Sequence, residues 1–141
     1  MPLSALWPAL LAGAGVAGTL DEVVLHQLLR WHHLYSGGDA DAGRISDGLF
    51  HAFSTGALVI GIVALARRSR ALSTRAMVGG IAVGAGGFNL YDATIQHKLL
   101  RLHQVREETG NLLPYDLAFG AIALAALAGG LLLLRGERER C

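Results

Sequence analysis

Aspartate and histidine recur at a fixed spacing in two segments of this 141-residue chain. Residues 21–33 and 92–104, which are 71 positions apart, both contain the pattern Asp-x4-His-x-Leu-Leu-Arg-x-His. Its aspartates and histidines are Asp21, His26 and His32 in the first copy and Asp92, His97 and His103 in the second. Neutral imidazole is the commonest protein ligand for transition metals, and carboxylates often accompany it. The pattern therefore predicts a bound transition metal, with zinc, copper or iron as the suspected ion.

The other polar residues near these copies widen the candidate site. The candidate metal ligands are all six histidines of the chain: His26, His97, His51, His32, His33 and His103. Further residues are candidates either for ligation or for orienting the rings, because a metal-bound imidazole usually donates its second N–H to a neighbouring acceptor. These are Asp21, Asp92, Asp47, Asp116 and Asn89.

No catalytic residue is predicted. The sequence contains no CxxC, HExxH, phosphate loop or nucleophile elbow. The single cysteine, Cys141, is the last residue, and two methionines are too few for a soft thioether site. Mixed nitrogen and oxygen ligands thus remain the predicted donor set, and whether the protein is an enzyme stays open.

The composition is typical of a membrane protein. Hydrophobic residues make up 52% of the chain and charged residues 16%. Four apolar stretches are each about long enough to cross a hydrocarbon core of ~30 Å. They are Leu3–Leu29, Leu49–Ala66, Met77–Leu100 and Leu113–Leu134. We therefore expect an all-α fold, a four-transmembrane-helix bundle in contact with the lipid bilayer, forming one integral membrane domain over residues 1–141.

The two copies of the motif indicate an internal repeat. The first copy lies in residues 1–70 and the second in residues 71–141, and residues 47–52 also resemble residues 116–121. Two membrane spans return a chain to the side on which it started, so two such halves run in the same direction. We expect two parallel helix pairs related by an axis along the membrane normal.

Helix geometry constrains how the histidines meet. At about 100° per residue of an α-helix, Asp21 and His32 lie on one stripe, while His26 lies on another with Glu22 and His33. His26 and His32 are then separated by about 120° around the axis. We therefore predict that a metal site is assembled between helices and that no single helix offers both histidines to one ion.

The helix starts and the arginines predict the topology. Ser46 and Asp47 are expected to cap the second helix, and Asp116 to follow Pro114 in the first turn of the fourth. Seven basic residues lie in the central link or after the last helix, namely Arg67, Arg68, Arg70, Arg75, Arg135, Arg138 and Arg140. Five lie on the other side, namely Arg30, Arg44, Lys98, Arg101 and Arg106. The positive-inside rule then predicts cytoplasmic termini and extracytoplasmic histidines in a bacterial plasma membrane. A net charge of +1 gives no indication of nucleic-acid binding.

Four pieces of the sequence together resemble a bacterial membrane family catalogued as domain of unknown function 2243. They are Asp21…His26-Gln27-Leu28-Leu29…Trp31-His32-His33, Asp47-Gly48-Leu49-Phe50-His51-Ala52, Phe88-Asn89-Leu90…Asp92…His97…Leu100…His103…Val105-Arg106, and Asp116 at the start of the last helix. The resemblance implies a four-helix integral membrane protein with no assigned reaction. It also implies an association with respiratory-oxidase and copper-handling proteins as partners.

This chain departs from the family pattern at three positions. Glycine usually follows the first and third aspartates of the pattern, whereas Glu22 and Ala93 stand here. A second histidine often follows the one at position 97, whereas this chain has Lys98. If that additional imidazole is a ligand in relatives, the site of this protein is altered.

Three classes of function remain open from the sequence. The leading hypothesis is metal handling or respiratory-oxidase assembly, or a membrane metalloenzyme, built on the histidine cluster. The second is a haem-binding electron carrier with His26 and His97 as the two axial ligands. The third is a structural or assembly subunit whose polar residues only hold the helices together.

Overall fold

The described part of this chain is all-helical and contains no strand. The structure is a computed structural model that describes residues 3–68, 72–107 and 109–138. Helix α1 (Leu3–Asp21) continues as the π-helix η1 (Glu22–Leu28), and α3 (Thr74–Tyr91) continues as the π-helix η2 (Asp92–Leu99). The other two helices are α2 (Ala40–Arg68) and α4 (Leu113–Arg138). The prediction of an all-α fold is thus confirmed.

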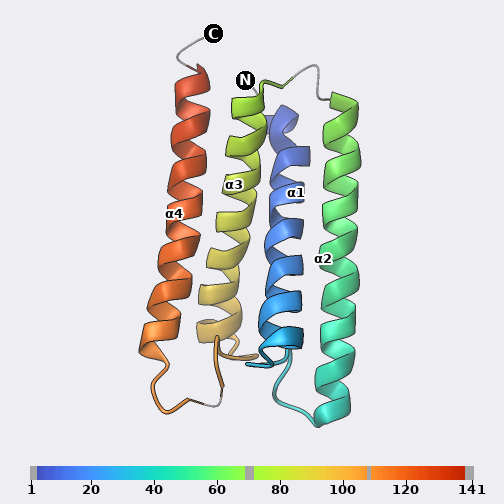
Figure 1. Ribbon diagram of the computed structural model, residues 1–141, viewed down its shortest axis with the longest axis vertical. Coiled ribbons are helices and arrows are strands. Elements are labelled where there is room, and N and C mark those ends of the chain that lie inside the picture. Colours follow the sequence, from blue (N-terminus) through green and yellow to red (C-terminus); the bar gives the residue numbers. More distant parts are fainter. Residues whose placement is uncertain (1–2, 69–71, 108, 139–141) are drawn as a thin grey trace.

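The four helices lie side by side with α1 and α3 in the middle (Figure 1). Helix α1 packs against α2 and α3, and α3 packs against α4. Within the described residues α2 and α4 make no contact with each other. The arrangement is therefore a row of four helices in which the two outer helices do not meet.

Glycines allow the two inner helices to touch backbone to backbone. A Cβ atom added to Gly13 would lie 2.0 Å from the carbonyl oxygen of Ile81, and one added to Gly84 would lie 2.0 Å from that of Leu10. Both separations are far below any van der Waals contact. Only glycine fits at these two positions, because small residues are what permit close approach of helices in a membrane.

The contacts of the inner helices with the outer ones are built in the same way. A Cβ atom on Gly15 would lie 2.3 Å from the backbone nitrogen of Leu58 in α2, and one on Gly86 would lie 2.4 Å from that of Leu127 in α4. Each inner helix therefore carries glycines on both of its packed sides. This close packing fixes the positions of η1 and η2, which extend from α1 and α3.

Three helices are long and apolar enough to cross a membrane. They are Ala5–Leu28, Ala40–Arg68 and Leu113–Gly136. Helix α3 with η2 is not among those found in the described residues. Five of the 18 residues of α3 are glycine, which lowers its hydropathy, and it lies between α1 and α4. The outward faces of α2 and α4 carry large exposed apolar side chains such as Phe53, Ile60 and Leu132, the surface expected against lipid.

The second helix begins earlier than the sequence indicated. Helix α2 begins at Ala40, and Asp39 Oδ1 accepts a hydrogen bond from the Ala42 backbone nitrogen at 2.8 Å. The prediction that Ser46 and Asp47 cap this helix is therefore wrong, because the helix begins at Ala40, about two turns before them. Asp116 does lie in the first turn of α4, as predicted.

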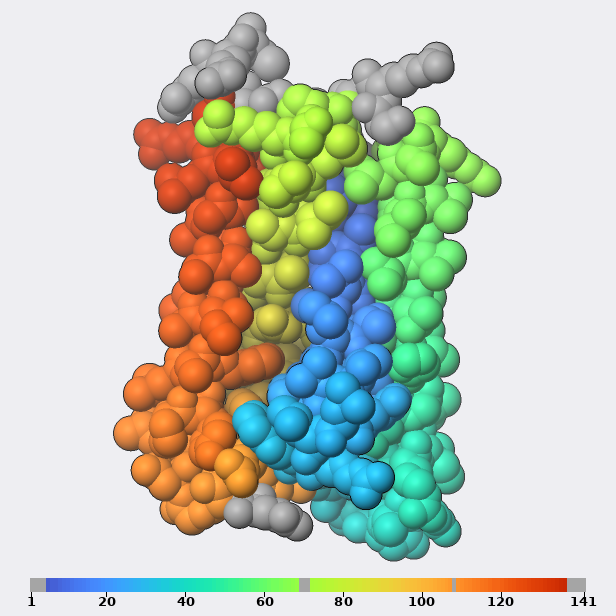
Figure 2. Space-filling model, viewed as in Figure 1, coloured from blue at the N-terminus to red at the C-terminus, as the bar shows by residue number. Residues whose placement is uncertain are grey.

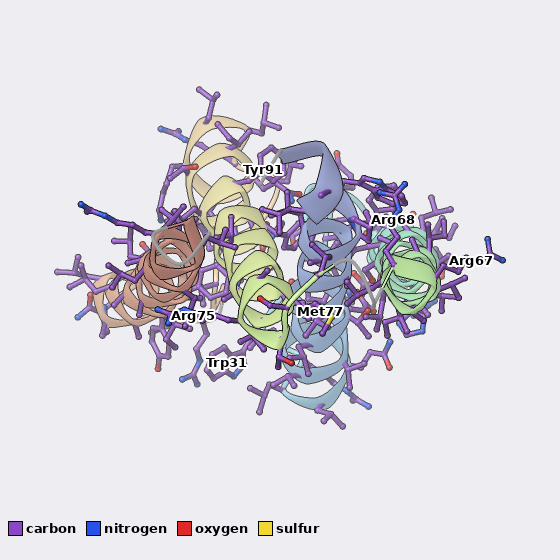
Figure 3. The ribbon with its side chains drawn as sticks, turned by 90° about the horizontal axis from the view of Figure 1, so that it is seen from above. Trp31, Arg67, Arg68, Arg75, Met77 and Tyr91 are labelled. Atoms are coloured by element: carbon purple, nitrogen blue, oxygen red, sulfur yellow. The ribbon has the colours of Figure 1, made fainter. Side chains whose placement is uncertain are left out.

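The two ends of the molecule differ in charge and in chemistry. Helix α1 begins and α4 ends at one end, while η1, η2 and the loops after them lie at the other (Figure 1). Arg67, Arg68 and Arg75 surround the first end (Figure 3). There Arg68 lies 5.4 Å over the Trp7 ring, and Arg75 Nε donates to the Leu133 carbonyl at 3.0 Å.

Candidate metal centre

The last turns of both inner helices are π-helical, and this brings each aspartate of the repeated motif to its histidine. A π-helix pairs residues five apart, where an α-helix pairs residues four apart, and such turns are frequent at functional sites. His26 Nε2 lies 3.3 Å from Asp21 Oδ2, and His97 Nε2 lies 3.1 Å from Asp92 Oδ2. The x4 spacing between aspartate and histidine therefore fits a π-helical turn.

After each π-helix, one arginine adopts the left-handed backbone conformation. It turns the chain back toward the end of that helix. Arg30 and Arg101 both have φ of 52°, a conformation that non-glycine residues adopt rarely. The bonds that close the two turns run from Trp31 N to Leu25 O at 2.9 Å and from Leu102 N to Gln96 O at 3.0 Å. His32 and His103, two residues after these arginines, thereby return to the ends of their own helices.

Two triads of aspartate and histidine result. One comprises Asp21, His26 and His32 and the other Asp92, His97 and His103, and in each triad one ligand atom per residue lies within 4.8 Å of the other two. All six residues are buried. No single helix offers both histidines, because η1 ends at Leu28 and His32 lies in the loop after it. The prediction that each site is assembled between helices is wrong, because the turn after each π-helix returns the second histidine to its own helix.

The four histidine rings of the triads form one cluster. Ring centroids lie 4.4 Å apart for His26 and His32 and 4.5 Å apart for His97 and His103. His32 and His103 stack on each other at 4.5 Å and join the two triads. The triads therefore lie next to each other, between η1 and η2.

The loop after each π-helix orients a histidine of the other triad. His32 Nδ1 donates to the carbonyl oxygen of Val105 at 2.9 Å, and His103 Nδ1 donates to that of Leu34 at 2.9 Å. A carbonyl can only accept, so each Nδ1 carries the proton and each Nε2 of a neutral ring keeps its lone pair. Both rings are thus held in the tautomer that ligates through Nε2.

Backbone hydrogen bonds tie the two loops together. The Ser36 nitrogen donates to the Leu102 carbonyl and the Glu107 nitrogen donates to the Trp31 carbonyl, both at 3.1 Å. Figure 2 shows the segment that follows η1 packed against the segment that precedes α4 at this end of the molecule. Hydrogen bonds in both directions hold the four rings in a fixed arrangement.

Nε2 of all four rings is buried and makes no well-directed hydrogen bond among the described residues, although three of these atoms face aspartate oxygens at 3.1, 3.3 and 3.7 Å. Asp21 Oδ1 is buried and unpaired in the same way. A buried polar atom without a partner costs about 1–3 kcal/mol. A bound cation would satisfy these four nitrogens, which lie together beside two carboxylates.

Burial keeps the loop histidines neutral. Burial lowers the pKa of His32 to about 3, and the neighbouring imidazoles of His26 and His103 add to this effect. Burial also lowers the pKa of His103, although the Asp92 carboxylate opposes it. Both rings are therefore in the form that binds a metal at neutral pH.

The surroundings of the two π-helical histidines differ. His26 Nδ1 lies 3.0 Å from Asp47 Oδ1 and 2.9 Å from Glu22 Oε2. In the second half Ala93 stands at the position of Glu22, and His97 Nδ1 is buried without a hydrogen bond. Asp116, which the sequence pairs with Asp47, instead binds Lys98 Nζ at 2.6 Å.

Comparison with known proteins now assigns the family. The model of a family described as "Predicted membrane protein (DUF2243)" matches residues 8–137. The chain belongs to this family. The resemblance inferred from the sequence is confirmed, and the family description agrees with the three apolar helices in making this a membrane protein. No curated protein and no solved structure gives a significant match.

The remaining predicted site residues of this DUF2243 protein lie around the triads. His33, with 44% of its side chain exposed, contacts Asp47 Oδ2 through Nδ1 at 2.6 Å. His51 in α2 lines a cavity of about 350 Å³ together with Glu22 and Asp47. Asn89 lies in α3, where its carbonyl accepts the backbone N–H of Asp92.

One buried acid was not predicted to belong to the site. Glu22 is fully buried, and its carboxylate contacts His26 Nδ1 at 2.9 Å. The available sequence signal was its position directly after Asp21, where the second half of the chain has Ala93. An extra carboxylate in an apolar helix beside a ligand motif is itself unusual.

Proposed function

We propose that this membrane protein binds two transition-metal ions, one in each Asp-His-His triad, and handles them for transfer to a partner. The observation that carries the proposal is the pair of buried triads whose four Nε2 atoms make no well-directed hydrogen bond among the described residues. Three protein ligands per ion leave a coordination position open. An open position suits exchange of the ion with a partner, and it also suits a bound substrate.

The donor set favours a borderline transition metal. Two imidazole nitrogens and one carboxylate oxygen per triad suit Zn²⁺, Cu²⁺ or Fe²⁺ better than the hard cations Mg²⁺ and Ca²⁺. Asp21 and Asp92 offset part of the charge of the two ions. The hydrogen bonds from His32 and His103 to backbone carbonyls make the rings better ligands.

The geometry favours two ions over one. Within each triad the ligand atoms lie within 4.8 Å of one another, whereas the ring pairs between triads include separations of 6.1 Å for His26 and His103 and 6.2 Å for His32 and His97. Two-metal sites commonly hold their ions about 3.5–4 Å apart. Adjacent triads joined by stacked rings are consistent with such a pair.

The ring packing weighs against haem. His26 and His97 would need a flat apolar slot between them to act as the two axial ligands of one macrocycle. His32 and His103 occupy the space between their triads and stack on each other. A purely structural role would need the His–Asp contacts to be good hydrogen bonds, and none of the four buried Nε2 atoms makes one among the described residues.

Matched contacts 71 positions apart support a duplicated fold with four membrane spans. Arg30 and Arg101 share one φ value, and the contacts of His32 and His103 with backbone carbonyls have the same length. If the basic end faces the cytoplasm, as the positive-inside rule favours, the metal centre opens to the extracytoplasmic side. Delivery to a respiratory oxidase stays a prediction from the family resemblance.

Metal analysis of the purified protein tests the proposal. The protein in detergent is dialysed against Zn²⁺ and its bound zinc is measured by elemental analysis, for the wild type and for a His97→Ala/His103→Ala variant. We expect the variant to bind one equivalent less per chain, because it keeps only one triad. His51→Ala is the control, since His51 is in neither triad. Equal zinc in the wild type and the double variant would refute the proposal.

A further inference from the structure

We propose that Glu22, Asp47 and Nδ1 of His26 form an outer site for a third divalent transition-metal ion, linked through the His26 ring to the inner triad. The proposal rests on the proposed function, because His26 belongs to both sites. One ligand atom from each of the three residues lies within 4.8 Å of the other two. Among the described residues only the first half of the chain has such a group.

The contacts converge on one nitrogen. His26 Nδ1 lies 2.9 Å from Glu22 Oε2 and 3.0 Å from Asp47 Oδ1. The side chains of His26 and Glu22 are 0% and 1% exposed, and that of Asp47 is 13% exposed. Two carboxylate oxygens and one imidazole nitrogen form a mixed donor set that suits a divalent transition metal.

One carboxylate oxygen of Glu22 makes no good hydrogen bond. Asp47 Oδ1 is hydrogen-bonded to His26 Nδ1, and one ring nitrogen carries at most one proton. Glu22 Oε1 accepts a hydrogen bond from Gln27 Nε2 at 3.0 Å, but Glu22 Oε2 is buried and its 2.9 Å contact with His26 Nδ1 is not a well-directed hydrogen bond. A buried ionised carboxylate is stable only when it is paired or bound to a metal. An ion between Glu22 and Asp47 satisfies that oxygen and offsets the repulsion between the two acids.

Two pockets open to the surface reach this site. A cavity of about 600 Å³ is lined by His26 and Asp47, and one of about 350 Å³ is lined by Glu22 and Asp47. Nε2 of His26 faces the inner triad, while Nδ1 faces Glu22 and Asp47. When both nitrogens ligate, the ring gives up its remaining N–H proton to solvent in the cavity and bridges the outer and inner ions.

The second half of the chain lacks the pair of acids that the first half places at His26. Ala93 supplies no carboxylate, and the acid corresponding to Asp47 is Asp116, which binds the Lys98 ammonium at 2.6 Å. One lysine there neutralises one acid. In the first half two acids lie at His26 Nδ1, and the metal ion supplies positive charge to them as Lys98 does to Asp116.

The test counts bound zinc after removal of Glu22. Wild type, Glu22→Ala and Glu22→Gln are dialysed against Zn²⁺ in detergent, and zinc per chain is measured by elemental analysis. Alanine reproduces the residue present at position 93, and glutamine keeps the shape and the contact with Gln27. We expect three equivalents in the wild type and two in both variants. Glu107→Ala, which removes an exposed acid lining the larger cavity, should retain three.

The outcomes separate this site from the proposed inner centre. If the wild type and both Glu22 variants bind two equivalents, with binding about 10–100-fold weaker in the variants, Glu22 only orients His26 and the outer site is refuted. Three equivalents in wild type and variants alike would also refute it. A wild type that binds no zinc would refute the inner centre as well. A comparison of thermal midpoints shows whether the variants are folded.

Discussion

The two halves of this molecule place their triads alike and surround them differently. Each half ends its inner helix in a π-helix, follows it with an arginine at φ of 52°, and brings a histidine back from the loop. The backbone therefore sets the ligand geometry in both halves. The difference lies outside the triads, where side chains set the charge: two carboxylates face His26 Nδ1, whereas Lys98 neutralises the only corresponding acid, Asp116, beside η2.

The backbone and the outer side chains therefore control two different properties of a metal centre, its ligand geometry and its charge. The shared backbone features keep the ligand atoms converged without help from the outer residues. The outer residues can then vary, as Glu22 and Ala93 do, and change how strongly each half attracts a cation. Two half-sites of the same shape but unequal charge would fill in sequence, the more acidic one first.

The largest effect should come from breaking the packing that both halves share. Gly13→Ala and Gly84→Ala would each put a Cβ atom 2.0 Å from a carbonyl oxygen, so both should lower the free energy of unfolding by about 3 kcal/mol. Thermal unfolding in detergent measures the change. Gly87→Ala and Gly129→Ala, where a Cβ would meet nothing within 4 Å, are the controls. Strongly unequal effects of the first two variants would contradict an equivalent role for the two glycines.

Acid should destabilise the metal-free protein through the loop histidines. His32 has a pKa of about 3 in the folded state and about 6.5 when unfolded. The unfolded chain thus takes up the proton first, so stability is complete above about pH 6.5 and falls as the pH drops toward 3. At pH 5 the loss from His32 alone is about 2 kcal/mol. Chemical unfolding of the chelator-treated protein at pH 7 and 5 measures it.

The control for this prediction is the neighbouring His33, whose side chain is 44% exposed. His33→Gln should keep the same loss of stability between pH 7 and 5, whereas His32→Gln should reduce it. If His32→Gln leaves the pH dependence unchanged, burial of this ring is not its cause.

The ligand residues were visible in the sequence because their side chains and spacing recur. The pattern over Asp21, His26 and His32 repeats at Asp92 and onward, and the structure brings both sets together. The membrane character and the helices also followed from hydropathy. A pattern of residue types that repeats along the chain can be recognised from the sequence alone.

The turns that bring the three residues of each triad together could not be predicted from the sequence. The π-helical turns and the left-handed arginines depend on tertiary packing, and no residue type marks them, since arginine has no preference for positive φ. The acceptors for His32 and His103 are backbone carbonyls of Val105 and Leu34. Any residue supplies a carbonyl, so only the fold reveals which one is used.

The smallest predicted effect tests the charge difference directly. Lys98 Nζ binds Asp116 at 2.6 Å, with about half of the lysine side chain exposed, so solvent weakens its influence and the expected free-energy change is below about 1 kcal/mol. Lys98→Gln removes a positive charge beside His97 and should tighten binding of the ion in the second half by about 2–5-fold, measured by Zn²⁺ titration in the Glu22→Ala background. Arg101→Gln, which removes a charge from the exposed turn, should change that affinity less. Weaker binding in Lys98→Gln would mean that Lys98 acts by holding Asp116 in place, because loss of a repelling cation can only favour the metal.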